Sequence, residues 1–219
     1  METSNHRSAV FIDVDLTLLK CESFRTFILK TYFKAGFLDL SRLTWPYFLR
    51  RLGRINIAQF KKQCLFLFKG MRRSELEMLG YQFSQSVLLK HIRPGARLVL
   101  ADYKSKGLPI YLVSASPHFY IYSLSNQLDL SGTFATELKY IKDEFTGDFD
   151  GSECIGEEKL RRLQLFSETA NIDLKSSFFY TDSFEDMPLL KSVGFPTAIW
   201  PDKRLKKICK KKGWPIEYW

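Results

Sequence analysis

Residues 9–19 read Ala-Val-Phe-Ile-Asp-Val-Asp-Leu-Thr-Leu-Leu, an apolar stretch that runs into two aspartates one residue apart. Side chains alternate between the two faces of a strand, so Asp13 and Asp15 are expected on the same face near its C-terminal end. In an open parallel sheet, ligands bind beyond that end of the strands. Two adjacent carboxylates repel each other unless a positive charge, most often a divalent cation, compensates them. An Asp-x-Asp pair alone also fits a polar turn after a strand, so the choice depends on the residues downstream.

The composition is that of a globular protein. The 219 residues, 45% of them hydrophobic, suffice for one domain with a good core or for a domain with an inserted module. The longest apolar run in mid-chain, residues 64–68, is far shorter than the roughly 20 residues that span a bilayer. Residues 1–8 are polar and carry no signal-peptide pattern. The four cysteines lack Cys-x-x-Cys spacing, which indicates neither a disulfide framework nor a zinc site and predicts a cytoplasmic location.

The net charge of +9 is unevenly distributed. Residues 20–90 contain fourteen Lys and Arg against four Asp and Glu, and residues 203–219 contain seven against one. The rest of the chain is therefore acidic. Basic runs are ordinarily solvated helix faces. The chain has no zinc finger and no Arg/Lys-Gly-aromatic strand motif, so nucleic acid is not favoured as a partner.

Residues 20–90 have the pattern of several short amphipathic helices. The first is expected to stop near Gly36, and a second is expected to be capped by Asn56. Ser74 with Glu77 forms a capping-box pattern before a third. This segment therefore predicts a helical module.

After residue 90 the pattern changes to strands and helices in alternation. Apolar strands are predicted at residues 108–113, 133–136, 177–181 and 195–200. A hairpin-like stretch is predicted through residues 146–147. Helices are predicted to end near Gly107, to begin at Ser116-Pro117, and to span residues 159–166.

This alternation predicts an α/β fold with a Rossmann-like, doubly wound parallel sheet. A helical cap is inserted after its first strand. The expected organisation is a flexible N-terminal tail at residues 1–8, a core formed by residues 9–19 and 91–219, and the helical cap at residues 20–90.

Four polar features fall where the predicted strands end or the helices begin. A serine after a strand is ordinarily a helix cap, and a lysine on a helix is ordinarily solvated, so each feature alone is weak. Their common position at one edge of the sheet indicates a shared site. The four are Asp13-x-Asp15-x-Thr17, Ser114 after strand 108–113, Lys159 in Gly156-Glu157-Glu158-Lys159, and Asp182 with Asp186 after strand 177–181.

In this order and with these flanks, the chain resembles the haloacid dehalogenase superfamily of phosphotransferases, whose four signature motifs these features match. The resemblance narrows to the branch that contains phosphoserine phosphatases and phosphatidylglycerophosphatase C-like enzymes, which insert a helical cap between the first two motifs. It rests further on Cys154-x-Gly-x-x-Lys159 and on residues 182–190. The chain departs from the pattern at Leu16, where Gly or Ser is common, and at Thr181, where Gly is common. Leu16 is expected to alter the path of the backbone between Asp15 and Thr17.

The resemblance implies an aspartyl-phosphate mechanism, and the residue types suit it. Asp13 is expected to be the nucleophile and Asp15 the general acid and base. Mg²⁺ prefers oxygen ligands and few protein carboxylates, which suits Asp13, the main-chain carbonyl of Asp15, and Asp182. Asp186 is expected to bind the ion through a water molecule or to orient the groups around its ligands. The residues expected to hold the phosphoryl oxygens are Thr17, Ser114, Ala115 and Lys159.

The sequence therefore predicts a Mg²⁺-dependent phosphatase that hydrolyses an organic phosphate monoester. Two alternatives stay open. A phosphotransferase would pass the phosphoryl group to an alcohol instead of water, a difference that the sequence does not reveal. A non-catalytic protein with the same fold would bind phosphate or nucleic acid through the basic segments, although the presence of both Asp13 and Asp15 disfavours it.

Substrate recognition is predicted at the cap. Glu22, nine residues after Asp13, matches an acidic position that contacts the substrate's amino group in phosphoserine phosphatases, and is expected at the cap entrance. Arg50 and Arg51 belong to an aromatic and basic stretch at residues 45–54, which suits contact with an anionic membrane. The partner is thus predicted to be either an anionic lipid phosphate at the inner face of the membrane or a phosphorylated small molecule.

Overall fold

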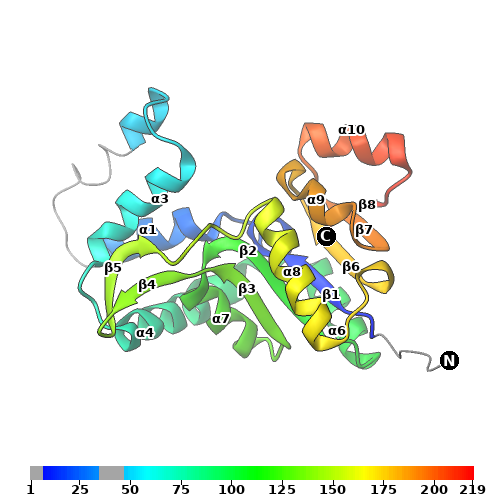
Figure 1. Cartoon of the computed structure of the whole chain (residues 1–219), viewed down its shortest axis with the longest axis horizontal. Coiled ribbons are helices and arrows are strands. Elements are labelled where there is room, and N and C mark those ends of the chain that lie inside the picture. Colours follow the sequence, from blue (N-terminus) through cyan, green and yellow to red (C-terminus); the bar gives the residue numbers. More distant parts are fainter. Residues whose placement is uncertain (1–6, 35–46) are drawn as a thin grey trace.

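A parallel sheet of six strands forms the centre of the molecule (Figure 1). The computed structural model describes residues 7–34 and 47–219. The strand order is β3-β2-β1-β6-β7-β8, and each neighbouring pair is parallel. The strands are β1 (Val10–Asp13), β2 (Ile110–Pro117), β3 (Gly132–Thr136), β6 (Phe178–Thr181), β7 (Phe195–Ile199) and β8 (Ile216–Glu217).

Alternate side chains of β1 enter two separate hydrophobic clusters. Val10 and Ile12 pack on one face with residues of α6 (Pro94–Ser105) and α7 (His118–Gln127). Phe11 packs on the other face with residues of α8, α9 and α10. Both faces of the sheet are covered, which is why β1 is apolar on both sides. The predicted doubly wound α/β fold is confirmed. The helices of the second face are α8 (Glu157–Ala170), α9 (Met187–Leu190) and α10 (Lys203–Lys212).

The winding of the sheet changes direction between β1 and β6. From β1 the chain moves outward to β2 and β3, and it then returns to the opposite side of β1 to form β6, β7 and β8. Ligands of open α/β sheets bind at such a point, beyond the carboxyl ends of the strands. Asp13 is the last residue of β1, and Asp182 directly follows β6. The topology therefore brings these two carboxylates together.

Most of the segment between β1 and β2 is helical. It contains α1 (Ser23–Lys34), a helical turn at residues 47–51, α3 (Ile57–Leu65), and a helix that begins as α4 (Arg73–Phe83) and continues to the end of α5 (Leu89–His91). The buried ring of Phe27 in α1 lies 5.2 Å from Phe83 and 5.3 Å from Phe119 of α7, measured between centroids. Helices α1, α3 and α4 thus share one hydrophobic cluster with α7.

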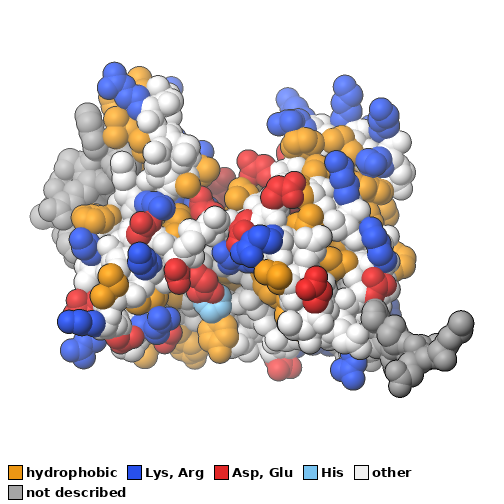
Figure 2. All heavy atoms as spheres, viewed as in Figure 1, with side chains coloured by type: hydrophobic (Ala, Val, Ile, Leu, Met, Phe, Trp, Pro, Cys, Tyr) orange, Lys and Arg blue, Asp and Glu red, His pale blue; other side chains and the backbone are white. Residues whose placement is uncertain are grey.

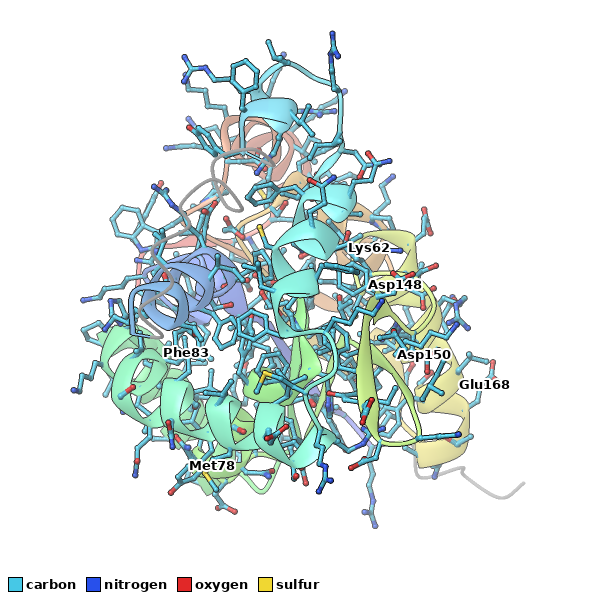
Figure 3. All side chains as sticks on the ribbon, turned by 90° about the vertical axis from the view of Figure 1, so that its left-hand side faces the viewer. Lys62, Met78, Phe83, Asp148, Asp150 and Glu168 are labelled. Carbon is cyan, nitrogen blue, oxygen red and sulfur yellow. The ribbon has the colours of Figure 1, made fainter. Side chains whose placement is uncertain are left out.

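A β-hairpin covers the outer side of α3. It consists of β4 (Leu138–Ile141) and β5 (Glu144–Phe149), which pair in antiparallel fashion. Figure 3 shows Lys62 of α3 and Asp148 of β5 side by side, and their side chains form an ion pair of 2.5 Å. The hairpin predicted through residues 146–147 is confirmed, because these residues lie within β5. The chain reverses at Lys142 and Asp143, which both have positive φ.

The structure corrects two predicted helix starts. α4 begins at Arg73, and the main-chain N–H of Arg72 donates to Glu75 Oε2 at 2.7 Å, so the capping pair is not Ser74 with Glu77. An isolated bridge between Arg72 and Glu144 fixes the chain there before the helix begins. β2 runs through Ser116 to Pro117, and α7 starts one residue later.

Some predictions concern residues outside the described ranges. These are the helix stop at Gly36, the aromatic residue Trp45, and residues 1–6 of the predicted flexible tail. Arg7 is described, and it forms a parallel bridge with Ile172. Asn56 caps α3 as predicted, with its side chain accepting the Gln59 N–H at 2.9 Å.

Candidate active site

A buried lysine held between two aspartates forms the floor of the site. Lys159 Nζ donates to Asp13 Oδ1 at 2.6 Å and to Asp186 Oδ2 at 2.8 Å, and the lysine side chain is only 3% exposed. The Thr181 hydroxyl donates to the same oxygen of Asp186 at 2.6 Å. Three predicted site residues, from β1, α8 and the turn after β6, are thereby joined in one hydrogen-bonded group.

The loop before α8 brings Lys159 close to Asp186. Gly156 precedes this helix with φ +54° and ψ −120°, a conformation that residues with a side chain rarely adopt. A Cβ atom at Gly156 would also lie 3.2 Å from the main-chain oxygen of Glu185. The glycine therefore allows the start of α8 to approach the turn that carries Asp186.

Burial of several carboxyl groups in one place changes their affinity for protons. Burial raises the pKa of Asp13 to about 7, against the charge of Lys159, with a further contribution from Asp186. Burial and the charge of Asp13 raise the pKa of Asp182 to about 8. Burial alone would lower the pKa of Lys159, but the charges of Asp13 and Asp186 outweigh this effect and raise it. Three acids thus share one lysine, and the site favours an additional cation.

Thr17 contacts Asp182 and is not in the pocket. Its hydroxyl accepts the main-chain N–H of Asp182 at 2.9 Å and donates to Asp182 Oδ1 at 3.3 Å. The side chain is fully buried. The predicted role of Thr17 as a phosphate ligand stays a prediction, and in this structure its hydroxyl is engaged in holding Asp182.

Leu16 has an uncommon backbone conformation between Asp15 and Thr17. Its φ of +59° and ψ of −5° lie in the left-handed region, where glycine is favoured. The Arg93 guanidinium donates to the Leu16 carbonyl at 3.0 Å. Glycine would adopt this conformation with less strain than Leu16 does. The conformation turns the chain so that Thr17 meets Asp182.

Asp15 is held by groups from two elements. Its Oδ1 accepts the main-chain N–H of Ser23 at 2.5 Å, and its Oδ2 accepts the Ser116 hydroxyl at 2.6 Å. Ser23 is the first residue of α1, and Ser116 lies near the end of β2. Neither serine is among the predicted site residues. The pattern Ser-x-Ser at residues 114–116 is the available signal, and only the fold shows which serine points where.

A pocket of about 890 Å³ lies over this group. Its lining includes Ala115 and Ser116 at the end of β2, and Glu22 and Arg50 from the helical segment. Its acidic and basic floor consists of Asp13, Asp15, Lys159, Asp182 and Asp186.

Two other predicted site residues are not in the lining of that pocket. Arg51 is exposed and lies outside it, so its predicted role at the cap surface stays a prediction. Ser114 is buried beneath the floor, where its Oγ accepts the Ser116 N–H at 3.1 Å.

A family model described as haloacid dehalogenase-like hydrolase matches residues 10–191. The chain belongs to this family. It is 27% identical over 221 residues to phosphoserine phosphatase SerB1 of Mycobacterium tuberculosis, covering 95% of this chain and 70% of that protein. It is 29% identical over 168 residues to a histidinol-phosphatase of Neisseria meningitidis, covering 75% and 76%.

The fold of this hydrolase also matches solved structures. A Bordetella pertussis protein of unknown function aligns with a TM-score of 0.84 at 24% identity, covering 97% of this chain and 98% of the other. The predicted family is confirmed, and the chain is a phosphatase of the haloacid dehalogenase type. No helix among the described residues is long and apolar enough to cross a membrane.

One lysine of the hydrolase's basic segment is not solvated. Lys61 of α3 is 8% exposed, and its Nζ donates to the Ala115 carbonyl at 3.1 Å and to Glu153 Oε1 at 2.6 Å. Glu153 lies in the loop before α8. Lys61 thus joins the helical segment to the end of β2 and to the loop that leads to Lys159, a contact that charge counting does not predict.

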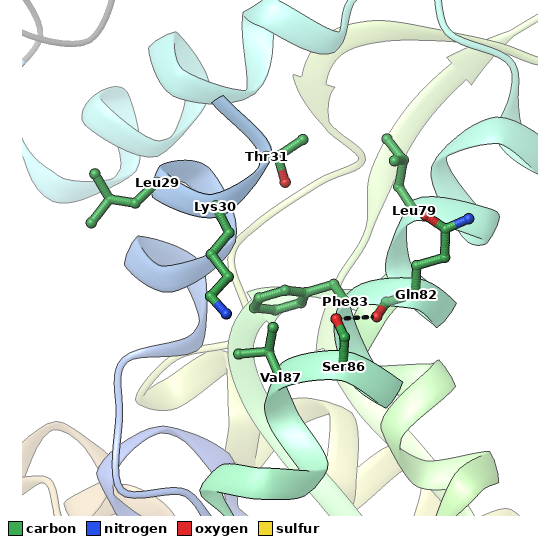
Figure 4. Close-up of a pocket in the computed structure, with 8 residues that line it drawn as sticks. All are labelled: Leu29, Lys30, Thr31, Leu79, Gln82, Phe83, Ser86 and Val87. Atoms are coloured by element: carbon green, nitrogen blue, oxygen red, sulfur yellow. Dashed lines mark hydrogen bonds between the residues drawn. The ribbon is translucent and has the colours of Figure 1, made fainter. Parts of the chain in front are cut away.

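A second cavity of the hydrolase, about 580 Å³, lies between α1 and α4 (Figure 4). Phe83 and Val87 form its apolar base, and Lys30 is the one charged residue among the described residues of its lining. The Ser86 hydroxyl is engaged with the Gln82 carbonyl at 2.6 Å. The described residues that line this cavity include no carboxylate and none of the reacting groups of the pocket over Asp13.

Proposed function

We propose that the chain is a Mg²⁺-dependent phosphomonoesterase that acts through an aspartyl-phosphate on Asp13. The observation that carries this proposal is the Asp13 carboxylate, bonded to buried Lys159 on the floor of a pocket that Asp15 also lines. A carboxylate beside a fixed positive charge is suited to attack phosphorus, because the charge attracts the phosphoryl oxygens.

The reaction follows from the positions of these groups. An Asp13 oxygen forms a bond to phosphorus as the bond to the leaving oxygen breaks, and Asp15 donates its proton to that oxygen. Lys159 and the main chain near Ala115 are the groups suited to hold the phosphoryl oxygens. In the second step Asp15 takes a proton from water, the water oxygen bonds to phosphorus, and Asp13 is released as carboxylate with inorganic phosphate as product.

The donor set fits Mg²⁺. Asp13 and Asp182 have raised pKa values, in part because each lies near other carboxylates with too little positive charge. Among the described residues, no three acidic, His or Cys side chains converge into a complete metal cage. Mg²⁺ keeps several waters and uses one or two carboxylates, so Asp13, Asp182 and the Asp15 carbonyl are a suitable set. The bound ion would neutralise charge on the transferred phosphoryl group.

The test is replacement of the nucleophile. Asp13→Asn is expected to reduce Mg²⁺-dependent hydrolysis of p-nitrophenyl phosphate by about 1,000-fold or more, since no covalent intermediate can form. Asp129→Asn is the matched control, because the Asp129 side chain is fully exposed. Full activity of Asp13→Asn would contradict the mechanism.

The pocket supports an organic phosphate as substrate. Glu22 lies in its wall as an acidic group that suits a substrate amine, and apolar side chains such as Leu29 and Ile57 line it while remaining 42% and 40% exposed. These walls favour a leaving group larger than a methyl or ethyl alcohol, because contact with them removes apolar surface from water. We propose a phosphorylated small molecule as the partner.

A lipid phosphate is the second candidate, and one observation favours it. Figure 2 shows Lys and Arg side chains gathered on two projections, the tip at residues 47–54 and α10, with a hollow between them. The tip also exposes Tyr47 by 59% and Leu52 by 53%. Exposed aromatic and basic side chains favour the headgroup region of an anionic membrane.

Vesicles separate the two candidates. The lipid hypothesis predicts stronger sedimentation with phosphatidylglycerol vesicles than with phosphatidylcholine vesicles at low salt. Arg50→Glu with Arg51→Glu should weaken this binding, whereas Lys90→Glu, in neither projection, should leave it unchanged. Equal sedimentation with both vesicles would leave the small-molecule phosphate as the proposed substrate.

A further inference from the structure

Asp15 lies at one end of a buried chain of hydroxyl groups. Ser116 Oγ donates to Asp15 Oδ2 at 2.6 Å and lies 3.0 Å from Ser23 Oγ, which in turn lies 3.4 Å from the Tyr120 hydroxyl. Ser23, Ser116 and Tyr120 are each at most 1% exposed. The chain of hydroxyls thus begins in the pocket and ends inside the hydrophobic core between α1 and α7.

The two oxygens of Asp15 are fixed from different directions. The Ser23 N–H, at the start of α1, meets Oδ1, while the Ser116 hydroxyl, at the end of β2, meets Oδ2. Two hydrogen bonds from two elements restrict the Asp15 side chain to one rotamer and fix the orientation of its carboxyl plane. A single bond would leave rotation about the Cβ–Cγ bond free.

Aromatic rings pack closely around this chain of hydroxyls. The Tyr120 ring stacks on Phe27 of α1 at 5.4 Å and meets Phe83 of α4 edge-on, also at 5.4 Å. Ser116 is held in addition by its own N–H, which donates to Ser114 Oγ at 3.1 Å. Since burial restricts each member to one position, the Ser116 hydroxyl has a defined direction toward Asp15.

We propose that Ser116 is the positioning residue for Asp15 and fixes its carboxyl group for proton donation to the leaving oxygen. This inference rests on the proposed phosphatase function. In the step concerned, the bond between phosphorus and the leaving oxygen breaks, the proton of Asp15 passes to that oxygen, and Ser116 keeps its own proton. Ser23 and Tyr120 support Ser116 and do not contact the reacting atoms.

The proposal predicts an effect that depends on the leaving group. An alkoxide is a poor leaving group and needs the proton, whereas p-nitrophenolate leaves readily without it. Loss of the Ser116 hydroxyl should therefore slow hydrolysis of an alkyl phosphate far more than hydrolysis of p-nitrophenyl phosphate. The ratio kcat/KM is the suitable quantity, because it covers the steps up to departure of the leaving group and excludes later hydrolysis of the aspartyl-phosphate.

The experiment compares Ser116→Ala, Ser116→Thr and the matched control Ser125→Ala with the unmodified protein on both esters. Ser125 is fully buried in α7 and donates to the Gly132 carbonyl, remote from Asp15 in the hydrogen-bond network. For Ser116→Ala we expect kcat/KM to fall about 10- to 100-fold on butyl phosphate and less than about 3-fold on p-nitrophenyl phosphate. Ser116→Thr restores the hydroxyl and should recover most of the butyl phosphate activity, and Ser125→Ala should affect both esters equally or not at all.

Three results would overturn the positioning role: an equal loss on the two esters, no loss on either, or a selective loss that Ser116→Thr fails to reduce while its melting temperature is normal. If Ser116→Ala does not fold, Tyr120→Phe removes the support of Ser23 and Ser116 and should give a smaller effect of the same selectivity. If the unmodified protein hydrolyses neither ester, that result would instead refute the proposed function.

Discussion

Removal of the Lys61 ammonium group is expected to reduce the stability of the fold far more than removal of the ammonium group of its neighbour Lys62. In Lys61→Met the aliphatic stem is retained, but Glu153 loses its partner at 2.6 Å while its side chain is only 8% exposed. A charge left buried without its partner costs about 3 kcal/mol or more. For a chain of this size, 1 kcal/mol corresponds to roughly 2–4 °C in Tm, so the expected decrease is about 6–12 °C.

The adjacent residue provides the control. Lys62 pairs with Asp148, but the two side chains are 41% and 52% exposed. Such a pair contributes about 0.5 kcal/mol, so Lys62→Met should lower the Tm by no more than about 2 °C. Thermal melts followed by circular dichroism measure both. Lys61→Met combined with Glu153→Gln should recover part of the loss, since the uncompensated charge is then removed.

Equal decreases in Tm for Lys61→Met and Lys62→Met would contradict the expected effect of burial on the ion pair. So would a double variant whose loss of stability equals the sum of the losses of its single variants, because that result would show no coupling between Lys61 and Glu153. In that case the bond from Lys61 to the Ala115 carbonyl would account for the effect of Lys61 on stability.

Three further predictions concern the site. Leu16→Gly should leave the free energy of unfolding within about 0.5 kcal/mol, because relief of the left-handed strain offsets the added chain entropy, while Leu16→Val should cost about 1 kcal/mol or more in urea titrations. Without Mg²⁺, the Tm should fall as the pH rises from about 4 to about 8, because Asp13 and Asp182, with pKa values of about 7 and 8 against 3.8 in the unfolded chain, bind more protons when the protein is folded. Saturating Mg²⁺ should release these protons and remove the dependence of the Tm on pH. A Tm that rises over this pH range without Mg²⁺ would contradict the raised pKa values. Glu22→Gln should lower kcat/KM about 10-fold on phosphoserine and leave ethyl phosphate unaffected, whereas equal effects on both would exclude contact with the amine.

The reacting groups could be predicted from the sequence because each lies next to a local signal. Asp13 ends an apolar strand, Asp182 directly follows another, and Lys159 lies three residues after a glycine, in the first turn of a helix. The parallel sheet then brings these strand ends to one edge, as the alternation of strands and helices indicates. The spacing of Ser74 and Glu77 predicted the wrong capping pair. A bridge from Arg72 to the β4–β5 hairpin fixes the chain before the helix, and α4 begins at Arg73.

The groups that hold Asp15 could not be predicted in the same way. Ser116 is 101 positions from Asp15, and its hydroxyl reaches the carboxylate because β2 extends two residues beyond Ala115. Lys61 is one of fourteen basic residues in its segment, and its sequence neighbours do not distinguish it from Lys62. Burial decides between the two lysines, and burial arises from the packing of α3 against the end of β2 and the loop before α8.

The central claim is that Asp13 becomes phosphorylated during turnover, and peptide mass spectrometry tests it most directly. The protein is mixed with Mg²⁺ and excess p-nitrophenyl phosphate, quenched in acid within milliseconds, and digested. We predict a phosphoryl group on Asp13 in the peptide that contains residues 8–20, with none in Asp13→Asn or without Mg²⁺. Hydrolysis at an unchanged rate with no phosphoryl group on Asp13 at any quench time, or with the group on another residue, would contradict the claim.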